Sequence, residues 1–271
     1  MLGGVTPILH GVLLLLKMPE SVRFMVANGM PVARIRAILV RISDAAISAR
    51  GFALTESAPG TGDNGLGLVL SRSYIVGSLM LWLAAFMGLL IIYALINWMP
   101  ILLKDAGLSL KSATVISALF PLGGVGAVLC GSLMDRFNAN LVIAACYALA
   151  AISLFCIGAT AGNVGLLVPI VLVSGVLMNT AQASMNALAA AFYPTEGRGT
   201  GVAWMLGMGR FGGIAGSFLV AELVRWHFTF VGVFATIAVA GALSCIALLV
   251  KQLAPPHVFR TAPDGVGSLS H

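Results

Sequence analysis

Charged and hydrogen-bonding side chains are rare in the apolar parts of this sequence, and a distinct group of them lies between residues 179 and 217. One apolar segment carries three amides, Asn179, Gln182 and Asn186, and the next carries a single full charge, Arg210. A guanidinium inside an apolar spanning helix is costly, so such a residue is a candidate functional site. Its chemistry is that of an anion holder, because the guanidinium can donate paired hydrogen bonds to a carboxylate.

The three amides fall within about 60° of one another when about 100° is allowed for each residue of a helix. Lipid cannot hydrogen-bond an amide, so this helix face should point into the protein. Two interpretations stay open: the amides join neighbouring helices, or they line one wall of a substrate cavity.

Arg210 lies ten residues into an expected span over 200–221, which is roughly 15 Å along the helix axis and about mid-bilayer. No Asp or Glu lies inside any complete expected span. An acidic partner would therefore have to be Asp135, Glu196 or Glu222 at a loop end, or come from outside this chain. The remaining alternative is an anionic substrate.

A second candidate wall lies on the expected span over 74–99. Its residues Trp82, Phe86, Tyr93 and Asn97 fall within about 60° on one helix face. Packing or lipid contact explains Trp82, whereas Tyr93 and Asn97 bring polar tips to the same face, where a flat aromatic ligand could stack.

Glycines recur around Arg210 in two small-xxx-small pairs, Gly209 with Gly213 and Gly212 with Gly216. Such pairs let helices approach closely. Two loops at the ends of spans are candidate gates, one formed by Gly131 with Asp135 and Arg136, the other by Glu196 with Arg198.

The composition is that of a multi-pass membrane protein, with 59% hydrophobic and 9% charged residues in a chain of 271. The net charge of +6 comes from basic residues in short loops, which topology explains better than nucleic-acid binding. The sequence contains no phosphate loop, no Gly-x-Ser-x-Gly and no His or Cys pattern with metal-ligand spacing. We therefore expect no enzyme, no metal and no cofactor.

The order of segments predicts four regions. Residues 1–17 read as the end of a helix, and residues 18–73 as a loop with an amphipathic surface helix near 32–42 and a flexible linker over 51–67. Residues 74–251 hold six expected spans: 74–99, 112–134, 141–161, 165–192, 200–221 and 228–250. Residues 252–271 read as a disordered tail.

Lys and Arg predict the orientation of these spans. Eleven of them lie on the side of the 18–73 loop and the C-terminus, against three on the other side, namely Lys104, Lys111 and Arg225. Basic residues favour the cytoplasmic side. The loop and the C-terminus are therefore expected to be cytoplasmic, in a cell inner membrane.

Several motifs resemble those of the major facilitator superfamily. Gly131-Ser-Leu-Met-Asp135-Arg136 is similar to its G-x-L-x-D-R loop between helices 8 and 9, and Pro19-Glu20-Ser21-x-Arg23 to its signature after helix 6. More specifically, two stretches resemble the aromatic acid:proton symporter family, namely Asn97-Trp-Met-Pro100 through Ser109, and Asn186 through Gly212 with Tyr193-Pro-Thr-x-x-Arg198 and Gly207-x-Gly209-Arg210-x-Gly212.

This resemblance implies an all-α membrane protein: the C-terminal six-helix half of a twelve-helix fold, with the end of helix 6 and the central cytoplasmic loop. It also implies proton-coupled uptake of small aromatic carboxylates such as benzoate or hydroxybenzoate by alternating access. The family's acidic residues of helix 1 would belong to a missing N-terminal half. Two departures bear on gating: Asn138 and Asn140 replace basic residues, and Ser217 replaces a proline.

Two other interpretations remain. The cargo could be another organic anion or a drug in the same superfamily. Alternatively, the chain is a non-transporting membrane remnant, or a partner subunit, from a truncated or split gene.

Overall fold

The computed structural model describes residues 13, 22–27, 30–41, 65–126, 134, 136–160 and 162–253. The chain divides into two units, Met1–Thr61 and Gly62–His271. Apart from Leu13, the expected helix end over 1–17 lies outside the described residues, as do most of the linker over 51–67 and the tail from residue 254. Gly131 and Asp135 of the candidate gate also lie outside them.

In the first unit, the described residues include two short helices, α2 (Val22–Ala27) and α3 (Val32–Leu39). A helix therefore forms where the apolar spacing predicts one. Ile35 of α3 is buried, whereas Val32, three residues earlier on the same face, is exposed, so the apolar face of this helix is only partly covered. Its location on a membrane surface remains a prediction.

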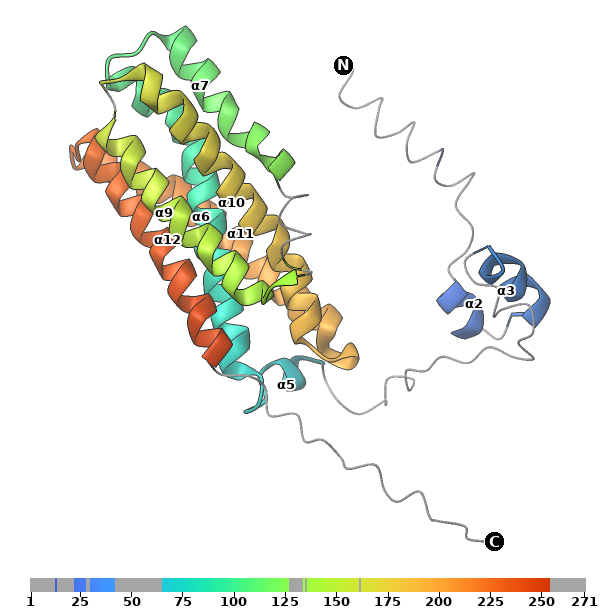
Figure 1. Ribbon diagram of the computed structural model, residues 1–271. Helices are drawn as coiled ribbons and strands as arrows, with labels where there is room; N and C mark the ends of the chain where they lie inside the picture. The colour runs from blue at the N-terminus through green and yellow to red at the C-terminus, as the bar shows by residue number, and fades with distance from the viewer. Residues whose placement is uncertain are drawn as a thin grey trace, which may run out of the picture. The chain divides into compact units, whose positions relative to one another are not determined.

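The second unit is a bundle of long helices that lie side by side (Figure 1). They are α6 (Ile75–Asp105), α7 (Leu110–Leu122) with the 3-10 turn η1 (Gly123–Gly126), α9 (Ala139–Ala159), α10 (Val164–Phe192), α11 (Thr195–Arg225) and α12 (Phe230–Leu253), preceded by the short α5 (Gly65–Val69). Helix α6 packs against α11 and α12 and also touches α7 and α10, while α9 packs between α10 and α12.

Local sequence explains where several of these helices begin and end. Ser109, Asn138 and Asn163 cap α7, α9 and α10, each with a side-chain oxygen that accepts a backbone N–H of the first turn. Helix α6 stops at Gly107, whose φ of +100° is a left-handed conformation that glycine adopts without steric cost.

Three boundaries differ from the expectations. Helix α6 continues through Pro100 to Asp105, because Leu102 and Leu103 are buried and their packing outweighs the lost proline hydrogen bond. Helix α11 begins at Thr195, five residues before the expected span over 200–221, so only Tyr193 and Pro194 separate it from α10.

The third difference concerns the linker. Residues 65–69, at its expected end, form α5, which packs against α11. Ser78 of α6 donates a hydrogen bond of 2.8 Å to the Val69 carbonyl, and the Tyr193 hydroxyl donates one of 3.0 Å to Ser78 Oγ. These bonds join α5 to the start of α6 and the end of α10.

Within the described part of the chain, four helices are long and apolar enough to cross a membrane: α6, α9, α10 and α12. Helix α7 is shorter, and residues 127–133 after it are not described. Helix α11 is long enough, but Arg210 and its many glycines lower its hydropathy. The described residues form an all-helical bundle with four helices suited to crossing a membrane, and the six-span arrangement remains a prediction.

Candidate functional site

Arg210 lies at the midpoint of α11 and its side chain is exposed. It makes no hydrogen bond or ion pair with any residue that the structure describes. The acidic side chains described are those of Asp105 and Glu222, and Glu222 pairs with Arg225 at 3.2 Å. Among the described residues, therefore, no carboxylate neutralises Arg210.

The surroundings of Arg210 on α11 are apolar and aromatic. Helical spacing puts Gly207 and Ile214 on the same face as Arg210, and the adjacent Phe211 is 63% exposed. A shallow cavity of about 300 Å³ is lined by Ala203, Trp204, Gly207, Met208 and Phe211. One face of α11 thus offers a cation beside a surface on which a ring could lie.

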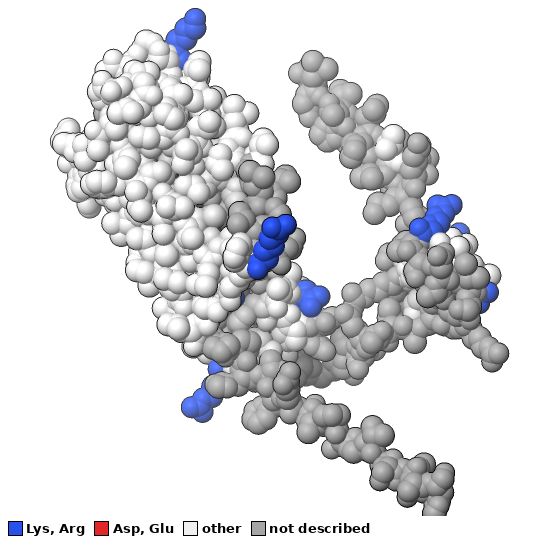
Figure 2. Space-filling model, viewed as in Figure 1, with Lys and Arg blue, Asp and Glu red and all other residues white. Residues whose placement is uncertain are grey.

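The face of the bundle visible in Figure 2 is mainly uncharged, with Lys and Arg side chains at separate points. An isolated cation on an apolar surface attracts an anion over a longer distance than it would in water, because surroundings of low dielectric constant weaken the attraction less.

Glycines bring α11 close to α6 at this site. A side chain at Gly212 or Gly216 would overlap the backbone carbonyl of Phe86 or Leu90. Gly213 lies against the ring of Tyr93. The small-xxx-small pairs predicted from the sequence thus lie in the contact between α6 and α11.

The aromatic stripe of α6 lies along this contact. Trp82 stacks on Trp204 of α11 with ring centroids 5.6 Å apart. Tyr93 is 47% exposed. Asn97 is exposed and its Nδ2 donates a hydrogen bond of 2.8 Å to Ser217 Oγ. The structure therefore brings Tyr93 and Asn97 together with the helix that carries Arg210.

Sequence reasoning missed two residues at this contact. Ser217 stood out as a departure from the family pattern, but its Oγ accepts from Asn97 and its carbonyl accepts from Trp98 Nε1 at 3.0 Å. Trp204 lies within the stretch Asn186–Gly212, and the structure shows that it stacks on Trp82 and lines the cavity.

The three amides of α10 have different surroundings. Asn179 Nδ2 donates to the carbonyls of Phe120 at 3.0 Å and Gly175 at 2.8 Å, so it joins α10 to the end of α7. Gln182 Oε1 accepts a 2.9 Å hydrogen bond from the Tyr147 hydroxyl of α9. Asn186 is exposed. The contacts of Asn179 and Gln182 are those of interhelical packing, and the substrate-facing role of all three remains a prediction.

The candidate gate is incomplete in the described residues. Arg136 and Arg198 are both exposed. The structure does not describe the side chain of Glu196, and it describes neither Gly131 nor Asp135. The gating roles of these five residues remain predictions. In the described part of the chain, no group of three or more His, Cys, Asp and Glu residues could hold a metal ion.

Comparison with known proteins connects this geometry to a family. The sequence model of the Major Facilitator Superfamily matches residues 5–217 and 81–269. The chain is 43% identical to a 4-hydroxybenzoate transporter of Pseudomonas aeruginosa over 93% of this chain and 57% of that protein. It is 44% identical to a gallate transporter of Pseudomonas putida over 80% of this chain and 48% of that protein.

A more distant relative is a benzoate transport protein of Acinetobacter baylyi, 32% identical over 64% of this chain and 37% of that protein. The chain spans about half the length of the curated relatives it matches. Because the superfamily model matches well over half of its residues, this chain belongs to the Major Facilitator Superfamily.

Proposed function

We propose that this chain forms the C-terminal half of a transporter that takes up aromatic carboxylates, such as benzoate or hydroxybenzoate, together with protons. The observation that carries the proposal is the exposed Arg210 at the midpoint of α11, without a carboxylate partner among the described residues. The names of the similar proteins, which transport 4-hydroxybenzoate and gallate, agree with an aromatic acid as cargo.

In this proposal the substrate carboxylate binds the guanidinium of Arg210, and its ring lies against the aromatic surface beside it. Tyr93 and Asn97 of α6 form one side of the site, close to α11 through Gly213 and Ser217. Asn179, Gln182 and Asn186 form a wall from α10, where the interhelical bonds of the first two fix their orientation. Substrate sites in such transporters lie at the midplane between two halves.

Alternating access then moves this half against an N-terminal half that supplies the other wall and the proton-binding carboxylates. The gate at the cytoplasmic end comprises Gly131, Asp135 and Arg136 with Glu196 and Arg198. The chain lies in the cell inner membrane with its central loop and C-terminus cytoplasmic, as the distribution of Lys and Arg favours.

The test is uptake of labelled 4-hydroxybenzoate by a bacterial host that makes this chain together with the N-terminal half of the Pseudomonas aeruginosa relative. We expect Arg210→Ala to lower uptake at least about tenfold, because a charge-assisted hydrogen bond to the carboxylate is lost. Arg210→Lys should also impair uptake, since an ammonium cannot bind a carboxylate through a planar fork. Arg225→Gln is the matched control, because Arg225 is exposed and pairs with Glu222.

Undiminished uptake by Arg210→Ala at equal membrane levels would overturn the assignment of Arg210. The other interpretations have their own outcomes. Competition by succinate instead of benzoate would indicate another organic anion as cargo. Membrane insertion of both halves without uptake of any tested anion would favour a non-transporting half.

A further inference from the structure

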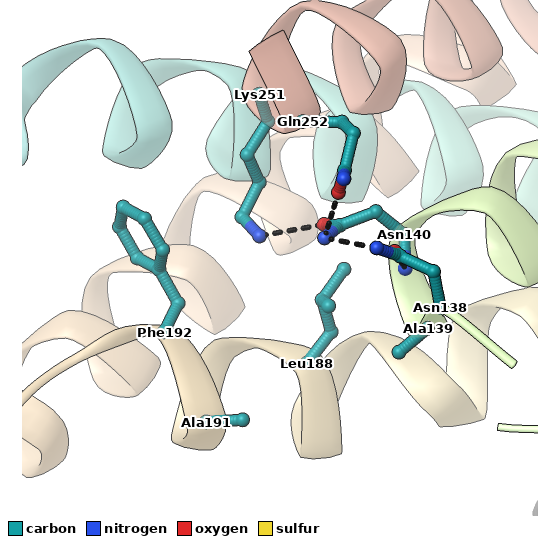
Figure 3. A pocket seen from close by; sticks show the side chains of 8 residues that line it. All are labelled: Asn138, Ala139, Asn140, Leu188, Ala191, Phe192, Lys251 and Gln252. Atoms are coloured by element: carbon teal, nitrogen blue, oxygen red, sulfur yellow. Dashed lines mark hydrogen bonds between the residues drawn. The ribbon is translucent and has the colours of Figure 1, made fainter. Parts of the chain in front are cut away.

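A buried lysine lies at one end of the bundle, away from Arg210. Lys251, in the last turn of α12, is 5% exposed. A lysine near the end of a spanning helix ordinarily extends its ammonium outward to water and headgroups. Here the side chain turns inward, toward Phe192 at the end of α10 and Asn140 at the start of α9 (Figure 3). The cation therefore sits where three helix ends meet.

The contacts of Lys251 hold a charge without neutralising it. Its Nζ donates a 2.7 Å hydrogen bond to Asn140 Oδ1 and lies 4.6 Å from the centroid of the Phe192 ring. Asn140 Nδ2 in turn donates a 2.7 Å hydrogen bond to Gln252 Oε1, which fixes the amide with its oxygen toward the lysine. Both partners of the ammonium are uncharged, and a ring face favours a cation.

Acidic side chains are remote from this position in the described part of the chain. Asp105 ends α6, and Glu222 lies near the end of α11. The Tyr193–Ser78 bond places the start of α6 beside the end of α10, so the far ends of α6 and α11 lie at the opposite end of the bundle. Among the described side chains, therefore, no carboxylate pairs with Lys251, and a buried ammonium is stabilised when an anion binds beside it.

There is space for that anion. A cavity of about 400 Å³ is lined by Asn138, Ala139, Asn140, Leu188, Ala191, Phe192, Lys251 and Gln252 (Figure 3). An ammonium has three N–H donors. One is used by Asn140 and one side faces the ring, so donor capacity is left for a ligand. The first turn of α9 also lines the cavity, and the positive end of the helix dipole favours an anion there.

We infer that this cavity, formed by the ends of α9, α10 and α12, binds the phosphate group of an anionic phospholipid. Helix α12 has 24 residues, about 36 Å at 1.5 Å per residue, so its last turn reaches the level of the headgroups. Basic pockets between spanning helices are known receptors for anionic headgroups. Free inorganic phosphate offers the same chemistry, and the experiment separates the two sources.

The test uses the whole chain in lipid nanodiscs of phosphatidylcholine alone, or of phosphatidylcholine and phosphatidylglycerol in a four-to-one ratio. Phosphatidylglycerol that stays bound after extraction is counted by native mass spectrometry. We expect Lys251→Gln to weaken its retention by about tenfold, because a charge-assisted hydrogen bond is lost. Arg72→Gln is the matched control: Arg72 is an exposed cation just before α6, at the same end of the bundle, and does not line the cavity.

A second measurement needs no variant. An amine-reactive reagent is applied to the unaltered chain, and modification of each lysine is read by peptide mass spectrometry. We expect phosphatidylglycerol to protect Lys251 and to leave Lys104 and Lys111, both exposed, as reactive as in phosphatidylcholine. Protection by inorganic phosphate in phosphatidylcholine discs would assign the site to a free anion with the same phosphate chemistry.

The inference is overturned if Lys251 reacts equally with and without phosphatidylglycerol and phosphate. It is also overturned if Arg72→Gln loses as much lipid as Lys251→Gln, since the attraction would then be a general effect of surface charge. Neither measurement depends on transport, so both can be interpreted even if the proposed transport function is wrong.

Discussion

The guanidinium of Arg210 has an unusual position for so apolar a chain. A cation near the centre of a spanning helix costs several kcal/mol on insertion scales, about 2.5–3.5 kcal/mol for Arg. Here it stands exposed at the midpoint of α11 beside Phe211, with no carboxylate among the described side chains to offset that cost. A bound anion would offset it, which is the physical reason for proposing a substrate site at this residue.

At the same scale, Gln182 offers a test between packing and substrate contact. Its oxygen accepts the Tyr147 hydroxyl, and both groups lie over Gly88 of α6. Gln182→Leu should lower stability by about 1–3 kcal/mol, because the buried Tyr147 hydroxyl loses its acceptor. The measurement is the thermal unfolding midpoint in detergent.

Asn186→Leu is the control for this prediction, because Asn186 is exposed on the same helix. We expect its stability to change by less than about 0.5 kcal/mol. An unchanged unfolding midpoint for Gln182→Leu, together with a raised KM for uptake, would show that Gln182 serves the substrate instead of the packing.

At the scale of elements, the contact between α6 and α11 positions the candidate site. Gly209 lies against Leu89, Gly212 against Phe86 and Gly216 against Leu90. Small residues at these positions let the two backbones approach, and in a membrane such packing is a main source of helix association. The same approach sets Tyr93 and Asn97 next to the helix of Arg210.

Gly212→Ala should therefore separate the two helices. The added methyl group would overlap the Phe86 carbonyl, and a backbone atom cannot move aside as a flexible side chain can. We expect a loss of about 1–3 kcal/mol of stability, the usual range for overpacking. The readout is again the thermal unfolding midpoint.

Gly207→Ala is the matched control for Gly212→Ala. It lies on the same helix, and a methyl group there meets nothing within 4 Å. We expect equal or slightly higher stability, because alanine is a better helix former than glycine by about 1 kcal/mol. Equal destabilisation by both substitutions would contradict the role of the close contact.

At the scale of the whole molecule, the distribution of basic residues predicts which end of the bundle faces the cytoplasm. Arg72, before α6, and Lys104, in the last turn of α6, are exposed at opposite ends of one helix. In a chain with its native cysteines replaced, Lys104→Cys should react with a membrane-impermeant maleimide applied from outside. Arg72→Cys should react only after the membrane is opened. The reverse pattern would invert the proposed orientation.

The length of the match also matters at this scale. The chain covers 57% of one relative and 48% of another, and a midplane site between two halves needs both. One half can supply Arg210 and the ring surface. Coexpression with an N-terminal half tests whether that half supplies the second wall of the site.

Much about this protein follows from the sequence alone. Apolar runs of helical length, the isolated Arg210 and the glycine pairs are linear features, because hydropathy and helical spacing depend on residues near one another in the chain. They predict an all-helical membrane protein, and the motifs around Asn186–Gly212 indicate its superfamily. Both predictions are confirmed by the helical bundle and by the superfamily match.

Other features depend on contacts between segments far apart in the chain, which no local pattern encodes. The bond from Asn97 to Ser217 spans 120 residues, and the bond from Lys251 to Asn140 spans 111. Hydropathy gives each helix an apolar surface but does not say which neighbour a given side chain meets, because dispersion attraction acts between any apolar groups in contact. The tertiary structure alone therefore placed Gly212 against Phe86 and turned Lys251 into the cavity between α9, α10 and α12.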